Sequence, residues 1–248
     1  MSLDAWAYGE MVAAGECSVG EALLLLSEVL TDRYDALDTG MAMLDQFVLE
    51  IAEPSNEALA ATVLGPYGLS GDVENYHAEE NSFLDLVLER RVGMPITLCG
   101  AVVEVALHRG RQLSMIGMPG HVIVGTEDPD TFIDAFGGAV VGMDWVRLRY
   151  QSIFGAGAAL PPNALAPMTI EDTIIRVCNN LFRTWAQDRT GKVDSLLDVR
   201  SRLRVTRADA EFLLPVAVAR GQYDLAARFT QQINPDDPQA DELWARLN

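Results

Sequence analysis

The sequence predicts an α+β fold in which a buried central helix packs against a small antiparallel sheet, between N-terminal helices and a C-terminal helical tail. Three observations lead to this prediction. The chain on both sides of its middle carries apolar residues at helical spacing. Residues 95–110 are apolar almost all round, which is typical of a helix in the middle of a domain. Two short apolar runs, His121–Gly125 and Thr131–Asp134, are joined by turn residues and indicate a hairpin.

Two helices are predicted near the N-terminus. Ser18–Glu21 is a capping-box pattern, and apolar residues recur at helical spacing from Ala22 to Val29. A second helix is expected from about Leu37, because its apolar residues fall on one stripe and Pro54 follows its end. Both helices are interpreted as scaffold.

The segment before the central helix carries turn and capping residues. The run Gly65–Gly71 is rich in turn residues, and Asn81 is predicted to cap the helix that follows it. Pro95 suits the first turn of the central helix, because its missing N–H would have no partner there. Gly110 is expected to end that helix.

The C-terminal part is predicted to be helical beyond a linker at residues 156–169, where prolines and small residues disfavour a packed element. This divides the chain into a domain with an N-terminal helical region (1–155), the linker and a C-terminal helical region (170–248). Residues 221–226 with Pro238 resemble the second half of a tetratricopeptide unit. Since a lone unit cannot bury its own apolar face, this unit is expected to pack back on the main domain.

The composition excludes several classes of partner and site. Among 248 residues, 18 Lys and Arg stand against 36 Asp and Glu, and the net charge of −18 disfavours nucleic acid and anionic membranes. No apolar run approaches the roughly 18 residues of a membrane span, and the N-terminus lacks the basic start of a signal peptide. Cys17, Cys99 and Cys178 lack the spacing of a zinc site or a disulfide framework. We expect a cytoplasmic protein without a metal or cofactor; the sequence indicates no oligomeric state.

His121 and Asp134 are predicted to share one face of the hairpin, since alternate residues of a strand point to the same side. If the turn closes a symmetric hairpin, Ile123 lies opposite Asp134. His121 then becomes the diagonal neighbour of Asp134, roughly 7–8 Å away at the backbone. That distance allows an imidazole base and a carboxylate that orients it. A single-residue bulge would send Asp134 to the other face.

Cys99 is the candidate nucleophile, with two interpretations left open. As a thiol in this region it would complete a Cys–His–Asp arrangement. It lies a full turn beyond Pro95, however, and so misses the free N–H groups and the positive helix end that lower a thiol pKa. The alternative is an inert core residue. Thr97 is nearer the helix start, but it is a weak nucleophile and points to roughly the opposite side.

One stretch of the chain resembles the bacterial SirB-type family, a branch of the transglutaminase-like superfamily with tetratricopeptide-like C-terminal helices. The stretch begins with NSFLDLVLERRVGMPITL (Asn81–Leu98) and continues with Met118–His121 and Phe132–Gly138. The resemblance runs through roughly residues 18–240. It is most specific where RRVGMP precedes PGH at plausible spacing.

The resemblance implies a papain-like thiol fold, with a nucleophilic cysteine at the start of a buried helix, a histidine opening one strand and an aspartate on the next. His121 and Asp134 match two of these positions. Pro95 takes the place of the cysteine, and Cys99 lies one turn late. Ala135 stands where the family usually has proline. A proline offers no nucleophile, so the resemblance places catalysis itself in doubt.

We therefore weigh three functions. The favoured one is a degenerate or non-catalytic member that binds a peptide, protein or small molecule in the former active-site cleft. The second is a thiol amidohydrolase or acyltransferase that uses Cys99 with the His121–Asp134 pair. The third is a purely structural partner in a larger complex. The candidate binding residues are Asn81, Pro95, Thr97 and Gly120.

Overall fold

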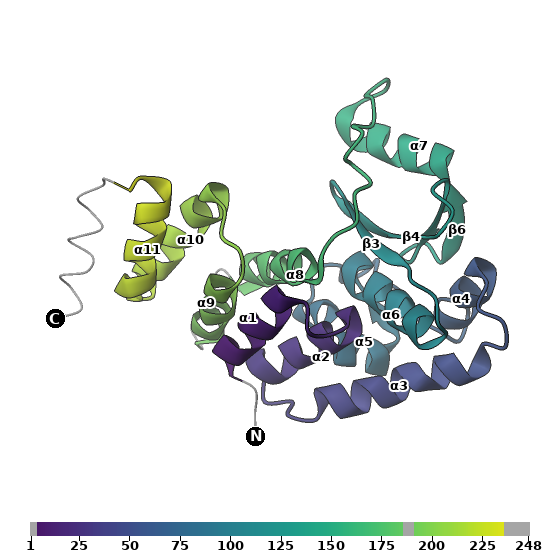
Figure 1. Cartoon of the computed structure of the whole chain (residues 1–248), viewed down its shortest axis with the longest axis horizontal. Coiled ribbons are helices and arrows are strands. Elements are labelled where there is room, and N and C mark those ends of the chain that lie inside the picture. The colour runs from purple at the N-terminus through teal and green to yellow at the C-terminus, as the bar shows by residue number, and fades with distance from the viewer. Residues whose placement is uncertain (1–3, 186–190, 236–248) are drawn as a thin grey trace.

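The computed structural model describes residues 4–185 and 191–235. Its helices surround a small antiparallel sheet, which confirms the predicted α+β class (Figure 1). The sheet lies towards one end of the molecule, and the C-terminal helices extend at the other end (Figure 1).

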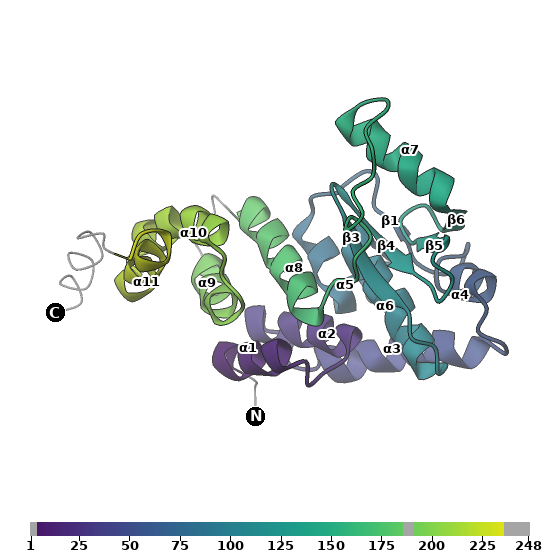
Figure 2. The same cartoon turned by 45° about the horizontal axis from the view of Figure 1, so that its top comes forward.

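The N-terminal part consists of the helices α1 (Ala5–Ala14), α2 (Val19–Leu30), α3 (Ala36–Glu50) and α4 (Asn56–Val63). The first three lie along the lower side of the molecule as drawn, and α4 lies beside the sheet (Figures 1 and 2). The predicted capping box opens α2: the Ser18 side chain accepts from the Glu21 N–H, and the Glu21 carboxylate accepts from the Ser18 N–H. The second predicted helix is α3, which begins one residue before Leu37. Both predicted helices are therefore confirmed.

The central helix is α6 (Pro95–His108), which lies between the N-terminal helices and the sheet (Figure 2). Pro95 is its first residue, as predicted. Gly100 lets α2 approach closely, because a Cβ atom there would lie 2.3 Å from a methyl group of Leu23. Gly110 follows the helix end with φ of +75°, a left-handed conformation that favours glycine.

The segment before α6 corrects the prediction for Asn81. Residues 79–82 form a short 3₁₀ helix, η1 (Glu79–Ser82), and α5 (Leu84–Arg90) then begins after Phe83. Asn81 does not cap this helix, because Phe83 takes the N-cap position. The Asn81 amide instead donates to the Asp72 carboxylate at 3.1 Å. The asparagine that suggested a helix cap in the sequence instead makes a buried polar contact.

The sheet has the order β3-β4-β5-β6 with antiparallel neighbours. The strands are β3 (Ser114–Met118), β4 (His121–Gly125), β5 (Thr131–Asp134) and β6 (Ala139–Gly142). β4 and β5 are the predicted hairpin, whereas β3 and β6 were not predicted. A separate parallel pair joins β1 (Ser70–Gly71) to β2 (Val92–Gly93).

The two faces of the sheet pack against different partners. Val122 and Val124 belong to the main core, which includes α6. Ile123 and Phe132 point to the other face, where they form a second cluster with Val146 of α7 (Met143–Phe154). The strand alternation thus separates α6 from α7 by the thickness of the sheet.

The predicted linker, residues 156–169, contains no helix, and a single bridge pairs its Pro167 with Ile116 of β3. Leu160 and Leu165 pack against the second cluster, so this segment also covers the sheet face under α7. The proposed division into domains stays a prediction.

The C-terminal part consists of α8 (Ile170–Trp185), α9 (Lys192–Arg202), α10 (Arg207–Ala219) and α11 (Tyr223–Ile233). α8 and α9 pack against α2 and α1. α10 and α11 pack mainly on each other and extend away from the sheet (Figures 1 and 2). The repeat-like segment in α11 therefore does not pack back on the main domain as expected, because α10 covers its apolar face. Pro238, part of the tetratricopeptide-like pattern, lies outside the described residues.

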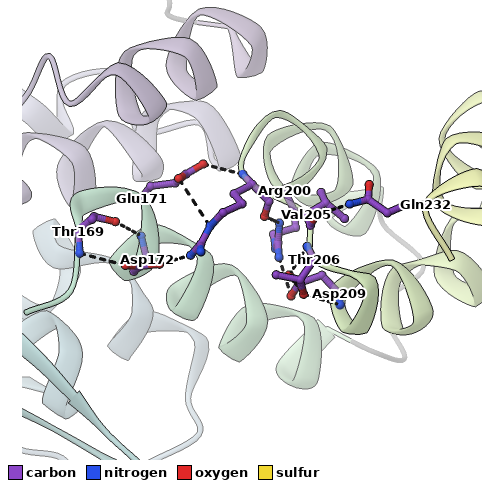
Figure 3. Close-up of polar contacts among 9 residues, drawn as sticks. Thr169, Glu171, Asp172, Arg200, Val205, Thr206, Asp209 and Gln232 are labelled. Atoms are coloured by element: carbon purple, nitrogen blue, oxygen red, sulfur yellow. Dashed lines mark hydrogen bonds and ion pairs between the residues drawn. The ribbon is translucent and has the colours of Figure 1, made fainter. Parts of the chain in front are cut away.

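Polar contacts fix the path of the chain between α9 and α10 (Figure 3). The fully buried Arg200 forms an ion pair with Asp209 at 2.7 Å and donates to the Arg204 carbonyl at 2.8 Å. The Arg204 N–H in turn donates to Glu171 of α8 at 2.6 Å. The base of the α10–α11 pair is therefore tied to both α8 and α9.

Candidate functional site

The strand pattern brings His121 and Asp134 together. The His121 Nε2 atom lies 2.9 Å from Asp134 Oδ1, and the two side chains are only 5% and 11% exposed. This is the contact expected from their places on adjacent strands. A hydrogen bond through Nε2 orients the ring and leaves Nδ1, which has no hydrogen-bond partner among the described residues, for a further contact.

Aromatic rings hold the His121 imidazole from two sides. The Trp145 ring of α7 lies 5.9 Å from it, and the Phe136 ring lies 6.4 Å away in an edge-on arrangement. Phe136 in turn contacts Tyr76 at 5.8 Å between ring centroids. Packing and the Asp134 hydrogen bond together fix the imidazole in one orientation.

A cavity of about 500 Å³ opens beside this pair, in the size range of small-molecule sites. We call it the α6–α8 cavity, because the start of α6 and one side of α8 form two of its walls. The β3–β4 turn and the segment around Tyr76 close it. The residues that line it are Tyr76, His77, Met94, Pro95, Ile96, Gly117, Met118, Pro119, Gly120, His121, Val122, Arg176, Asn179, Asn180, Arg183 and Thr184.

Pro95 stands at the position where a nucleophile would be expected. It is the first residue of α6, and it lines the α6–α8 cavity together with His121. The fixed φ of proline suits this helix start, and Met94 precedes it without a side-chain cap. The start of α6 therefore presents an apolar ring to the cavity rather than a hydroxyl or thiol.

Cys99 lies one turn deeper and is fully buried. Its Sγ donates to the Val122 carbonyl at 3.5 Å. Burial raises the pKa of the Cys99 thiol, and the negative charge of Asp134 raises it further. The thiol is therefore neutral at ordinary pH, and it does not line the α6–α8 cavity.

The other predicted binding residues divide into two groups. Gly120 lines the cavity in the two-residue β3–β4 turn. Its φ of +69° is a left-handed conformation that favours glycine. Asn81 and Thr97 are fully buried and do not line the cavity. Thr97 Oγ1 donates to the Asn81 carbonyl at 2.9 Å, and Arg90 donates to the Asn81 side chain at 3.1 Å. These two residues join α5, α6 and η1 behind the site.

The polar side of α8 was not among the predicted site residues. The helical prediction for this segment depends on apolar residues at helical spacing, which include Ile174 and Leu181 and are buried in the core. The cavity-lining residues of the same helix recur at i, i+3, i+4, i+7 and i+8, so a polar stripe was present in the sequence and could have been found. They are Arg176, Asn179, Asn180, Arg183 and Thr184.

Arg176 also shapes the cavity wall. Its Nη2 atom donates to the carbonyl oxygens of Met118 and His121, at 3.1 and 3.0 Å. The guanidinium thereby holds both ends of the β3–β4 turn, which has no side chain at Gly120 to fix it. Gly117 leaves room for this contact, since a Cβ atom there would lie 3.1 Å from Arg176 Nη1.

Within residues 4–185 and 191–235, no group of three or more His, Cys, Asp or Glu side chains is arranged to hold a metal ion. Nor does any helix in these ranges combine the length and the apolar character needed to cross a membrane.

Comparison with known protein families decides the class of the fold. The family model described as the transglutaminase-like superfamily matches residues 31–179, more than half of the chain. The chain belongs to the transglutaminase-like superfamily. The match spans the start of α6, the His121–Asp134 hairpin and the first part of α8, including Arg176 and Asn179. Thus the elements that build the cavity fall within the family region, up to the middle of α8.

The chain is also similar to several bacterial proteins described as UPF0162 proteins. It is 30% identical over 187 residues to one from Xylella fastidiosa strain Temecula1, a match that covers 67% of this chain and 66% of the relative. A relative from Haemophilus influenzae is 31% identical over 103 residues, covering 41% and 39% of the two chains. One from Pasteurella multocida is 27% identical over 114 residues, covering 45% and 43%. No solved structure matches this transglutaminase-like chain.

Proposed function

We propose that this transglutaminase-like protein is a degenerate, non-catalytic member that binds a peptide, protein or small molecule in the α6–α8 cavity. The observation that carries the proposal is the position of Pro95: it opens α6 and lines the cavity with His121. A cysteine nucleophile needs the free N–H groups and the positive end of a helix start to lower its pKa. At that place this chain has a ring without a nucleophilic atom.

The state of Cys99 supports the same proposal. Thiol chemistry proceeds through the thiolate, and burial raises the pKa of this thiol. The sulfur meets β4 at the Val122 carbonyl. Among the contacts of the described residues, none joins the sulfur to the imidazole that would have to take its proton.

The ligand contacts would then come from the cavity lining itself. His121 is held rigidly by Asp134 and keeps Nδ1 for a ligand. Pro95 and Gly120, both predicted as binding residues, line the same space. We further propose that α10 and α11 act as a tetratricopeptide-like extension of the binding surface, and that the protein is cytoplasmic, as the sequence leads us to expect.

The second candidate function is a thiol amidohydrolase or acyltransferase, and the observation that favours it is the His121–Asp134 hydrogen bond of 2.9 Å. In that mechanism His121 takes the thiol proton, Asp134 stabilises the imidazolium, and the Cys99 thiolate attacks an amide carbonyl carbon. The C–N bond then breaks as His121 returns the proton to the leaving amine, and water or an acceptor amine releases the acyl group from the sulfur. The start of α6 would have to unwind by a turn to bring the sulfur into the cavity.

Iodoacetamide labelling of the folded protein at about pH 7, with each cysteine followed by mass spectrometry, separates the two functions. The non-catalytic proposal expects Cys99 to label as slowly as buried Cys178, with no change in the His121→Ala variant. The same thiols should label quickly in urea, which proves that the reagent is active. Fast labelling of Cys99 that depends on His121 would establish the thiol-enzyme alternative.

A ligand screen by thermal shift tests the binding function itself. Compounds and short peptides that fill the cavity should raise the melting temperature of the wild type, because they bind only the folded state. The His121→Ala variant should lose part of the shift. A broad screen in which no compound or peptide stabilises the wild type would count against the proposal.

A further inference from the structure

The α6–α8 cavity has an electrostatic character opposite to that of the whole chain. Arginines, histidines, neutral amides and the hydroxyl groups of Tyr76 and Thr184 supply its polar side chains, and none of the residues that line it is Asp or Glu. The full sequence, in contrast, carries 36 acidic residues against 18 basic ones. Two arginines, Arg176 and Arg183, therefore face a space from which carboxylates are missing.

Arg176 is partly buried, and its positive charge has no carboxylate within ion-pair distance among the described residues. Its Nη2 atom is engaged by two carbonyl oxygens. Burial lowers the pKa of this guanidinium, nearby Arg183 acts in the same direction, and Tyr76 and Cys99 oppose them. A partly desolvated cation beside a like charge is stabilised when an anion approaches.

Arg183 lies two turns further along the same side of α8. In the described part of the chain, its side chain makes a single hydrogen bond, a long one of 3.4 Å to Asn180 Oδ1. Arg183 is exposed and lines the cavity. Most other basic residues of the described chain are matched with a carboxylate. They are Arg33, Arg90, Arg111, Arg147, Lys192, Arg200, Arg204, Arg207, Arg220 and Arg228.

We propose that the cavity takes its ligand by an anionic group, a carboxylate or a phosphate, which binds between Arg176 and Arg183. This inference rests on the proposed binding function and adds the chemical class of the ligand. Guanidinium groups match both oxyanions with paired N–H donors. The rest of the stripe, Asn179, Asn180 and Thr184, offers neutral hydrogen-bonding groups for the remainder of the ligand.

Because the protein as a whole is acidic, its preference for an anionic ligand is confined to the cavity. At long range the net charge of −18 repels anions, so association depends on short-range contacts inside the cavity. A cavity of about 500 Å³ accepts a small anionic metabolite or the last residues of a peptide with a free carboxyl end. Both sources share the oxyanion, and the choice of probe separates them.

The experiment is a titration of the full chain with small probes, monitored by thermal shift and by NMR. Chloride salts keep the ionic strength constant throughout. The probes are inorganic phosphate, trialanine with a free carboxyl end and trialanine amide, each up to about 20 mM, because one or two charge-assisted hydrogen bonds give millimolar affinity. The variants are Arg183→Gln and Arg176→Gln. Arg149→Gln is the matched control, since Arg149 is an exposed arginine on α7 outside the cavity.

The proposal expects saturable binding of phosphate or trialanine, weakened about tenfold by Arg183→Gln and unchanged by Arg149→Gln. Phosphate alone binding indicates a phosphate-bearing ligand, and trialanine alone a peptide end. Because Arg183 is exposed, its variant keeps the fold even if Arg176→Gln loosens the β3–β4 turn.

Three results would overturn the proposal. One is the absence of saturable binding by either anion; another is equal binding by wild type and Arg183→Gln. The third is equal binding of trialanine and its amide without any phosphate binding, which removes the anionic selectivity but leaves the cavity as a binding site. The labelling of Cys99 then still decides the proposed non-catalytic function by itself.

Discussion

At the scale of single residues, the site combines the buried pair of His121 and Asp134 with a proline at the start of α6, where the proposed function places a lost nucleophile. His121 and Asp134 are buried, hydrogen-bonded at 2.9 Å and packed by Phe136 and Trp145. Such a pair keeps its geometry without a thiol, because its own hydrogen bond and the surrounding rings hold it. Pro95 fills the remaining position with a residue that stabilises the helix start. On the proposed non-catalytic function, the fold is therefore kept without the chemistry.

The first prediction concerns Asn81, which we interpret as structural although the sequence analysis proposed it for binding. Asn81→Ala should lower the free energy of unfolding by about 2–4 kcal/mol, because it removes a buried network of hydrogen bonds. The Asn81 amide donates to the Asp72 carboxylate and to the carbonyls of Asn75 and Tyr76, and its oxygen accepts from Arg90. Urea denaturation followed by circular dichroism measures the loss.

The matched control is Asn179→Ala, which removes the same amide from the cavity side of α8. It should change stability by no more than about 0.5 kcal/mol, because alanine is the better helix former and the side chain is only half buried. Equal effects of the two substitutions would show that Asn81 has no special structural role.

At the scale of elements, apolar periodicity and capping patterns predicted the features that neighbouring residues determine. The capping box before α2, proline at the start of α6 and the β4–β5 hairpin are read from neighbouring residues, and the structure has all three. The edge strands β3 and β6 were missed because their apolar runs are short, with Gly117 inside β3 and Gly142 at the end of β6. Asn81 was assigned wrongly as a helix cap, because a polar residue before an apolar run can equally belong to a buried hydrogen-bond network.

The second prediction concerns the joint between α9 and α10 (Figure 3). Arg200 is fully buried, whereas its partner Asp209 is 21% exposed. Asp209→Asn should therefore cost about 3–5 kcal/mol, because it leaves a buried cation unpaired. Arg200→Met should cost clearly less, since the remaining carboxylate keeps its contacts with Thr206 and some water. Urea denaturation of both variants measures the difference.

The exposed pair Arg207–Glu211 on α10 provides the control for this joint. Arg207→Met should change stability by only about 0.5 kcal/mol or less, because surface ion pairs contribute little. If Arg200→Met lowered the free energy of unfolding as much as Asp209→Asn, the difference in burial between the two residues would not determine the stability of this contact.

At the scale of the whole molecule, the cavity could not be predicted from the sequence. Its walls come from residues 76–77, 94–96, 117–122 and 176–184, which no local pattern connects. Two of its members, Pro95 and His121, could be proposed from the motif around them. The polar stripe of α8 could be recognised as a stripe, but nothing in the sequence says that it faces His121 rather than solvent.

The third prediction concerns stability in alkali. Burial raises the pKa of the Cys178 thiol from 9.0 to about 12, and it also raises the pKa of Cys99. The folded state binds these protons more tightly than the unfolded state does. Their contribution to stability is thus complete below pH 9 and is lost as the pH rises towards the folded pKa values.

The free energy of unfolding should accordingly fall above about pH 9, by about 1.4 kcal/mol per pH unit for each buried thiol. Urea denaturation with a reductant, at several values between about pH 7 and pH 10.5, measures the slope. Cys178→Ala should lower the stability at neutral pH but make the alkaline decline shallower. A decline of unchanged slope in that variant would contradict the assignment.

The central claim, that this is the former active site with its nucleophile replaced, is tested by placing a thiol at its first position. In Pro95→Cys the new side chain stands at the start of α6 and lines the cavity with His121, so its pKa should be lowered by the helix end. Pro95→Ala checks that the fold tolerates the change. Ser152→Cys supplies an ordinary exposed thiol on α7 for comparison.

The measurement is the iodoacetamide labelling rate at about pH 7, with each thiol followed by mass spectrometry. We predict that the thiol introduced by Pro95→Cys labels about tenfold or more faster than the one introduced by Ser152→Cys, and that adding His121→Ala removes most of the excess. A folded Pro95→Cys variant whose new thiol labels no faster than the reference, with or without His121, would contradict the claim.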